Sequence, residues 1–183
     1  FAAETEVVLL RDGRSNYQIV VPDHQETKAL SEGVHQVARL VQAAFLSNGA
    51  ELAIVAEKDR DAEKPAIFLG NTEFARRQGL NVAQLKDWSY VWRVVGQDVV
   101  IAGHDQKTPL PVDPKTKSSE GMDRFGSGKA AVDFLRQHMG VRFLYPDIPP
   151  RTPLSGAAKV DLLASPAIEF LPVQSCALPA DLH

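Results

Sequence analysis

Residues 124–146 constrain the fold most, because they contain one helix, one glycine stop and one strand in succession. Apolar residues recur here at spacings of three and four, which predicts one buried face of a helix. Gly126 and Gly128 flank Ser127 and predict a flexible helix entry capped by that serine. Gly140 predicts a left-handed stop, and residues 141–145 then read as a strand that ends at Pro146. The apolar face consists of Ala131, Phe134, Leu135 and Met139.

The chain before this helix predicts alternating strands and helices. Residues 7–10 and 17–21 are apolar runs on either side of an Asp12-Gly13 turn, so they predict a hairpin. A long helix follows, with Asp23 and Glu26 as its capping pair and Gly33 as a site of close packing. One face of this helix is apolar over about four turns: Leu30, Val34, Val37, Val41 and Phe45.

Residues 52–56 and 66–69 predict two further strands, and Asn71 caps a short helix that ends at Gly79. Residues 90–95 and 99–102 predict a second hairpin. The β-α-β connections imply parallel pairs and the hairpins imply antiparallel ones. The fold class is therefore α/β (α+β), with a mixed β-sheet and two main helices packed on it.

The predicted domain division follows from length and composition. Residues 1–150 form one α/β domain, and residues 151–183 form a linker or tail with an extra strand at 160–163. A formal charge of -3 gives no basic footprint for nucleic acid. No apolar run reaches the ~18 residues that span a bilayer, so a membrane partner is not expected. The start without Met and without an apolar leader suggests a chain that is processed or cut from a longer one. Both interpretations fit a removed secretion signal, so a secreted or periplasmic protein is expected.

The sequence offers little convincing chemistry. GSGK at residues 126–129 lacks the first glycine and the Ser/Thr of a phosphate loop. The acidic residues lie in charged or irregular stretches that do not fix two carboxylates at a catalytic distance: Asp59, Asp61, Glu63, Asp105, Asp113, Glu120 and Asp123. No histidine pair has metal-ligand spacing with a third ligand nearby. We therefore expect no catalytic residue, metal or cofactor, and the single thiol, Cys176, is expected to be inert.

Two groups of residues are candidates for ligand binding. Trp88, Tyr90 and Trp92 alternate along a predicted strand, so their side chains share one face. Such a row either packs in the core under a helix, which the apolar area of aromatic rings favours, or stacks on sugar rings. His104 and Asp105 follow the end of a strand, where active-site groups are often found.

Four sequence segments, taken in order, resemble segments of a known protein family. These are LLRDGRSNYQIVVP at residues 9–22, IFLGNTEFARRQGL at 67–80, VVGQDVVIAGHD at 94–105, and the helix–glycine–strand stretch. In the same order they resemble the N-terminal domain of α-glucuronidase-type glycoside hydrolases and of related bacterial proteins of unknown function. Lys129 and Ala130 depart from the hydrophobic pair often found in that family. In the last segment the matching residues are Ser127, Ala131, Val132, Asp133, Phe134, Leu135, Gly140, Val141, Arg142, Phe143 and Pro146.

The resemblance covers roughly residues 6–146. It implies the α/β fold shared with domain 2 of hexosaminidases, which precedes a catalytic (β/α) barrel and does not itself carry the catalytic carboxylates. The first hypothesis is therefore a non-catalytic accessory domain that packs on such a barrel. A second is an independent carbohydrate-binding module that uses Trp88, Tyr90 and Trp92. A third is a small hydrolase that works through His104 and Asp105.

Overall fold

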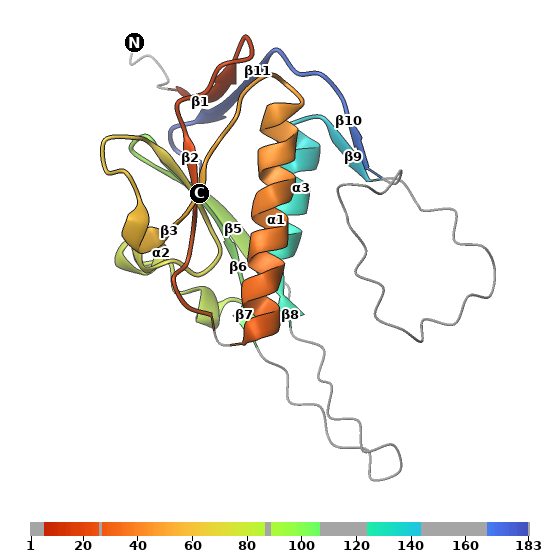
Figure 1. Cartoon of the computed structure of the whole chain (residues 1–183). Coiled ribbons are helices and arrows are strands. Elements are labelled where there is room, and N and C mark those ends of the chain that lie inside the picture. Colours follow the sequence, from red (N-terminus) through yellow and green to blue (C-terminus); the bar gives the residue numbers. More distant parts are fainter. Residues whose placement is uncertain (1–5, 26, 87–88, 107–123, 144–167, 183) are drawn as a thin grey trace, which may run out of the picture.

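The computed structural model describes residues 6–25, 27–86, 89–106, 124–143 and 168–182. Its centre is a five-stranded mixed sheet in the order β3-β2-β4-β6-β5 (Figure 1). Four strands are parallel, and β5 runs antiparallel to β6 at one edge. The strands are β2 (Gln18–Val21), β3 (Ile54–Ala56), β4 (Ala66–Leu69), β5 (Tyr90–Val95) and β6 (Asp98–Gly103).

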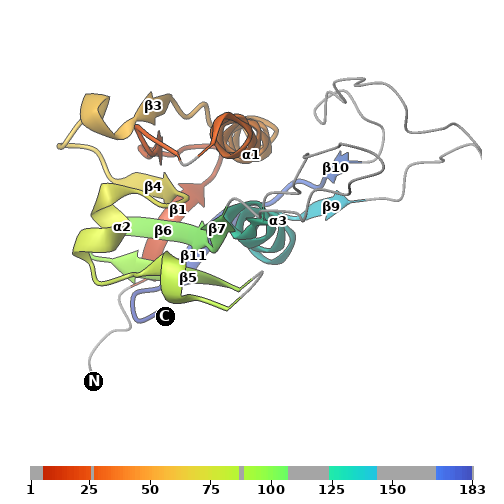
Figure 2. The same cartoon turned by 90° about the horizontal axis from the view of Figure 1, so that it is seen from below.

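Two long helices cover one face of the sheet and a short helix covers the other. Figure 2 shows α1 (Lys28–Leu46) beside α3 (Gly126–His138), with α2 (Glu73–Arg77) on the opposite side of the strands. Short 3-10 turns lie at η1 (Glu57–Asp59) and η2 (Val82–Gln84). The predicted α/β class, with a mixed sheet and two main helices, is confirmed. So is the β5–β6 hairpin.

Helix α1 forms as its apolar periodicity predicts, but its first residue is not the predicted one. The Thr27 hydroxyl caps the helix by accepting a hydrogen bond from the Leu30 N–H at 3.1 Å. Asp23 instead accepts a bond from the Lys58 N–H, so the predicted Asp23–Glu26 capping pair is wrong for Asp23, and Glu26 lies outside the described residues. A Cβ on Gly33 would come within 3.2 Å of the Phe125 ring, which explains a glycine inside this helix.

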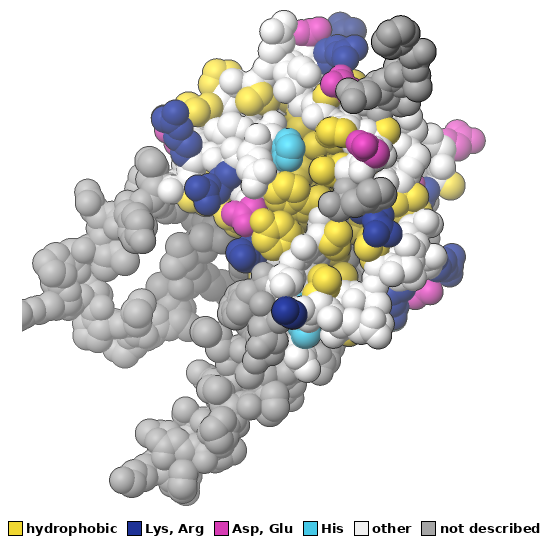
Figure 3. Space-filling model, turned by 180° about the vertical axis from the view of Figure 1, so that it is seen from behind, with side chains coloured by type: hydrophobic (Ala, Val, Ile, Leu, Met, Phe, Trp, Pro, Cys, Tyr) yellow, Lys and Arg dark blue, Asp and Glu magenta, His cyan; other side chains and the backbone are white. Residues whose placement is uncertain are grey.

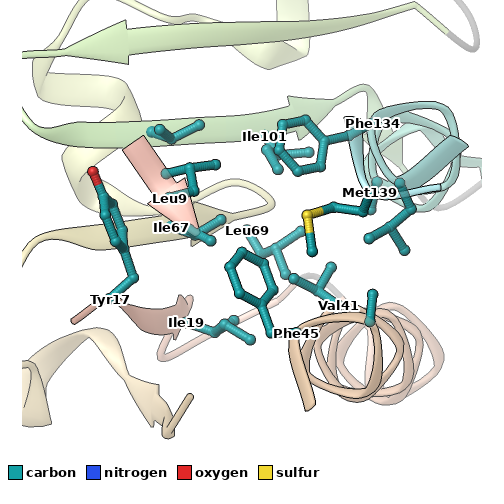
Figure 4. Packing of buried hydrophobic residues seen from close by; sticks show 14 of the residues in the cluster. Leu9, Tyr17, Ile19, Val41, Phe45, Ile67, Leu69, Ile101, Phe134 and Met139 are labelled. Carbon is teal, nitrogen blue, oxygen red and sulfur yellow. The ribbon is translucent and has the colours of Figure 1, made fainter. Parts of the chain in front are cut away.

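The main core lies between the sheet and the two long helices. Phe45 of α1, Phe134 of α3 and Ile101 of β6 meet there with no exposed surface (Figure 4). A smaller cluster on the other face joins the sheet to Ala75, Leu80 and Val82 around α2 and η2. Because both faces of the sheet are covered, every residue of β2 and β4 is buried.

The predicted first hairpin is wrong. The turn does form at Asp12 and Gly13, which both have positive φ, but only Arg11 and Arg14 pair across it. Beyond this turn β1 (Glu6–Arg11) pairs with the distant β11 (Ser175–Pro179), while β2 enters the central sheet. The physical reason is burial, because all four side chains of β2 are buried and a central strand has both of its faces covered.

The interpretation of the C-terminal residues as a tail is wrong for two segments. β10 (Ile168–Phe170) pairs with β9 (Val141–Phe143), and β11 pairs with β1. Leu178 and Cys176 of β11 are buried in the main core. The strand predicted at 160–163 lies outside the described residues.

The docking of β11 makes a prediction for Cys176, the single cysteine of the chain. Its side chain is 2% exposed, and burial raises the pKa of the thiol to about 12. We expect a thiol reagent such as DTNB at pH 8 to label Cys176 only as fast as β11 opens, far more slowly than free cysteine. Leu10→Ala, which removes a buried neighbour of the paired strand, should accelerate labelling. Labelling of the folded protein at the rate of free cysteine would contradict this arrangement.

Candidate functional site

The carboxyl ends of the parallel strands form the edge where a ligand site is most readily built. β2, β4 and β6 end at the same edge of the sheet, and α1 and α3 begin there (Figure 1). After β2 the chain crosses to β3 on one side, whereas β4 lies on the other side of β2. In open α/β sheets ligands bind outside the strand ends at such a reversal of strand order. His104 and Asp105 directly follow β6, so the structure places both predicted residues at this edge.

His104 is held between two oxygen atoms. It is 8% exposed, its Nδ1 lies 2.5 Å from the Leu85 carbonyl oxygen, and its Nε2 lies 3.0 Å from Oε1 of Gln106. A carbonyl oxygen can only accept, so Nδ1 carries the proton and donates it to Leu85. Nε2 of the neutral ring then accepts, so its contact with the Gln106 amide is a hydrogen bond when the amide turns its NH2 group toward the ring.

Asp105 is joined to the first turn of α3. Its Oδ1 accepts a hydrogen bond from the Ser127 N–H at 2.9 Å, so Asp105 caps the helix from outside. Burial raises the pKa of Asp105, and the hydrogen bonds from Ser127 oppose this effect. Its Oδ2 is shielded from solvent and has no hydrogen-bond partner among the described residues. A buried carboxyl group with one unpaired oxygen favours its neutral form.

Backbone packing brings the end of β6 directly against the start of α3. A Cβ on Gly103 would lie 2.2 Å from the Gly126 carbonyl carbon, and a Cβ on Gly126 would lie 2.5 Å from the His104 nitrogen. The Ser127 hydroxyl accepts a bond from the Gly103 N–H at 3.0 Å. We call Gly103, His104, Asp105, Gly126 and Ser127 the β6–α3 junction. The predicted serine cap is wrong, because Ser127 lies inside α3 and Phe125 occupies the N-cap position.

Polar side chains from the other two strand ends approach the same place. A Cβ on Gly70, the residue after β4, would lie 3.6 Å from Gln25 Nε2 and 3.8 Å from Ser127 Oγ. Gln25 Nε2 and Asn71 Oδ1 are both shielded and have no partner in the described part of the chain. Sequence reasoning missed these two residues. The available signal was their position directly after predicted strands, where polar side chains gather at one edge.

The aromatic row on β5 is used to hold α3. Trp92 Nε1 donates to the Ala130 carbonyl at 2.9 Å, and its ring meets Phe134 edge to face at 5.8 Å. The Tyr90 hydroxyl donates to Asp133 at 2.8 Å, and burial is the first cause that raises the pKa of this phenol. These contacts support the core interpretation for both rings, while Trp88 lies outside the described residues.

The same two rings are only partly buried, so they also contribute to the surface. Figure 3 shows hydrophobic side chains gathered on the face that carries β5, with acidic, basic and histidine side chains around them. Lys129 lies with its Nζ 5.2 Å from the Tyr90 ring centroid, and His138 contacts Trp92 edge to face at 5.5 Å. The row is therefore neither a fully buried core element nor a free platform.

The remaining acidic candidates are not brought together. Asp61 pairs with Lys64 at 3.7 Å in an exposed loop, while residues 113, 120 and 123 lie outside the described part. In the described ranges no three His, Cys, Asp or Glu side chains are grouped so that they could hold a metal ion. Across the same ranges we find no helix with the length and apolarity needed to cross a membrane.

The buried Asp105 predicts a pH dependence of stability. Its folded pKa is raised above the ordinary value of 3.8, so the folded state binds the proton more tightly than the unfolded state. The contribution of Asp105 is therefore largest near pH 3.8 and falls as the pH rises through the folded pKa. We expect the free energy of unfolding, measured by urea titration and compared with Asp105→Asn, to favour the wild type more at pH 4 than at pH 7. An unchanged difference across this range would contradict the burial of a strained carboxyl group.

Comparison of the chain with models of protein families, with curated proteins and with solved structures finds no match.

Proposed function

We propose that this chain is a non-catalytic N-terminal accessory domain of a glycoside-hydrolase-like protein. In this proposal it packs against a catalytic barrel and takes no part in bond cleavage. Two lines of reasoning support it: the four-segment resemblance to α-glucuronidase-type proteins, and the structural use of the polar groups at the β6–α3 junction. A bacterial, secreted or periplasmic protein of polysaccharide degradation is the setting that the resemblance implies.

The observation that carries the proposal is the occupation of the polar groups that could otherwise react. Glycoside hydrolysis needs two carboxyl groups at a defined separation, one acting as acid and one as base or nucleophile. Among the five residues of the β6–α3 junction Asp105 is the single carboxyl, and its Oδ1 is bonded to the Ser127 N–H. His104 directs one nitrogen to Leu85 and the other to Gln106. Both side chains therefore serve the packing of β6, with His104 bonded to Leu85 and Asp105 bonded to the start of α3.

The first test is the length of the reading frame that encodes this chain. A (β/α) barrel needs roughly 250 residues, so the proposal expects a segment of at least that size after residue 183. Residues 1–183 and that segment, produced separately and mixed, should form a one-to-one complex in analytical ultracentrifugation. A reading frame without such a segment, or two parts that do not associate, would contradict the proposal.

A second candidate function is carbohydrate binding, favoured by the partly exposed rings of Tyr90 and Trp92. Sugar rings stack on aromatic faces, and each ring retains some exposed area for this. Titration with oligosaccharides separates the two functions. A saturable signal that is lost in Trp92→Ala and kept in the surface variant Leu46→Ala would favour the module. No signal with either protein would leave the accessory domain as the function.

A further inference from the structure

A surface pocket of about 330 Å³ lies on the face of the sheet that carries α2, opposite the face that α1 and α3 cover. Its wall comes from the chain between α2 and η2, and its floor comes from β5. Val91 and Arg93 face it because they alternate with Tyr90 and Trp92, which face α3. Pockets of ~300 Å³ and above are large enough for a small molecule.

The wall of this pocket is formed without a ligand. Leu80 and Val82 are 8% and 3% exposed, and both are anchored in the smaller core cluster. The Leu80 N–H donates to the Ala75 carbonyl, and the Leu85 N–H donates to Val82. His104 fixes the far end of the wall through its bond to the Leu85 carbonyl. The cavity therefore needs little reorganisation on binding, which favours affinity.

Arg93 supplies an incompletely paired cation on the pocket floor. Its Nη1 donates to the Gln78 carbonyl at 3.3 Å, whereas its Nε is shielded and has no hydrogen-bond partner among the described residues. Because Nε is shielded from solvent, a ligand in the pocket meets the outer edge of the guanidinium, formed by Nη1 and Nη2. That edge matches the two oxygens of a carboxylate, which can accept two parallel hydrogen bonds from it.

The charged residues described around the pocket are mostly basic. None of its eight described lining residues is acidic. Arg76 and Arg77 lie in the last turn of α2, just before the wall, and the single Glu73 is shared between them at 2.6 and 3.4 Å. Basic residues around a concave surface raise the local concentration of anions.

The other lining residues determine which uncharged part of a ligand can pack in the pocket. Leu80, Val82, Leu85 and Val91 offer apolar surface, while the exposed amides of Asn81 and Gln84 can bond to polar substituents. We propose that this pocket binds a small organic carboxylate, whose charged group pairs with Arg93 and whose apolar body packs on Leu85 and Val91. This site is separate from the proposed packing on a barrel and does not depend on it.

The test is a titration of the whole chain with benzoate and with its neutral isostere benzamide, followed by ¹H–¹⁵N NMR at pH 7. We expect saturable shifts at residues 79–85 and 91–93 with benzoate, and at least about tenfold weaker binding of benzamide because it lacks the charge. Arg93→Gln should reduce benzoate affinity to the benzamide level. Arg93→Lys, which keeps the charge but not the paired donors, should lie between them.

Two controls make the outcome decisive. Arg142→Gln, an exposed arginine on β9 outside the pocket, should bind benzoate like the wild type. Circular dichroism of each variant checks that it is folded. If Arg93→Gln does not fold, the affinity of Arg93→Lys for benzoate is compared with that of the wild type instead. Equal binding of benzoate and benzamide, no saturation with benzoate, or tighter binding of inorganic phosphate than of benzoate would each overturn the proposal.

Discussion

Gly103→Ala should lower the free energy of unfolding by about 3 kcal/mol or more, the upper end of the range for overpacking and a large fraction of the stability of a typical domain. The added Cβ would lie 2.2 Å from the Gly126 carbonyl carbon and 2.7 Å from the Ser127 nitrogen. Both atoms are backbone, so no flexible side chain can move aside. Relief requires α3 to withdraw from β6, which would break the bonds of Ser127 to Gly103 and Asp105. Urea unfolding followed by circular dichroism measures the loss.

Gly79→Ala is the matched control for this substitution. Gly79 has a φ of +75°, but nothing lies within 4 Å of its added Cβ. Its replacement therefore carries only the cost of a left-handed alanine, roughly 1–2 kcal/mol. If Gly103→Ala cost no more than Gly79→Ala, the close contact between β6 and α3 would be wrong.

Phe134→Ala should destabilise the protein by about 3–5 kcal/mol, the range for removing a buried aromatic ring. Phe134 has no exposed surface and contacts the Trp92 ring edge to face at 5.8 Å and the His138 ring at 5.0 Å. Its loss leaves a cavity between α3, β5 and β6 that the rigid sheet cannot close. The shift in thermal midpoint and the tryptophan fluorescence should both report the change.

Leu46→Ala serves as the comparison for Phe134→Ala, because Leu46 is 57% exposed at the end of α1. Surface substitutions of this kind usually change stability by less than about 0.5 kcal/mol. A similar small effect for Phe134→Ala would mean that α3 does not pack on β5 as described.

Local patterns predicted the helices and most strands of this fold. The periodicity from Leu30 to Phe45 and the run from Ala131 to Met139 both correspond to buried helix faces. The stop at Gly140 is also confirmed by its φ of +63°. These features depend on spacing within a few turns of helix, which the sequence displays directly.

Pairing over long distances could not be predicted in this way. The Asp12-Gly13 turn predicted a local hairpin, but β1 pairs with β11, more than 160 residues away. Nothing in the sequence near Cys176 distinguishes a paired strand from a tail. Strand pairing depends on which surfaces remain unburied after the rest has packed, and that is a property of the whole fold.

The sequence predicted the position of His104 and Asp105 at a strand end, but it did not predict what these residues do in the structure. His104 and Asp105 were identified as residues after a strand, and they do lie at the carboxyl edge of the sheet. The role of Asp105 depends on Ser127, which lies more than twenty residues further on and contacts it because Gly103 and Gly126 meet. The role of His104 depends on the distant Leu85 carbonyl. The two glycines predict a flexible loop by composition, whereas the structure uses them for close backbone contact.

The most direct test of a non-catalytic accessory domain is the hydrolysis of aryl glycosides by residues 1–183, with release of 4-nitrophenol as the readout. The wild-type chain and His104→Ala, both checked for folding by circular dichroism, are assayed side by side. The account predicts that neither releases nitrophenol faster than buffer. A wild-type rate above buffer that disappears in His104→Ala would contradict it and assign a hydrolytic role to His104 and Asp105.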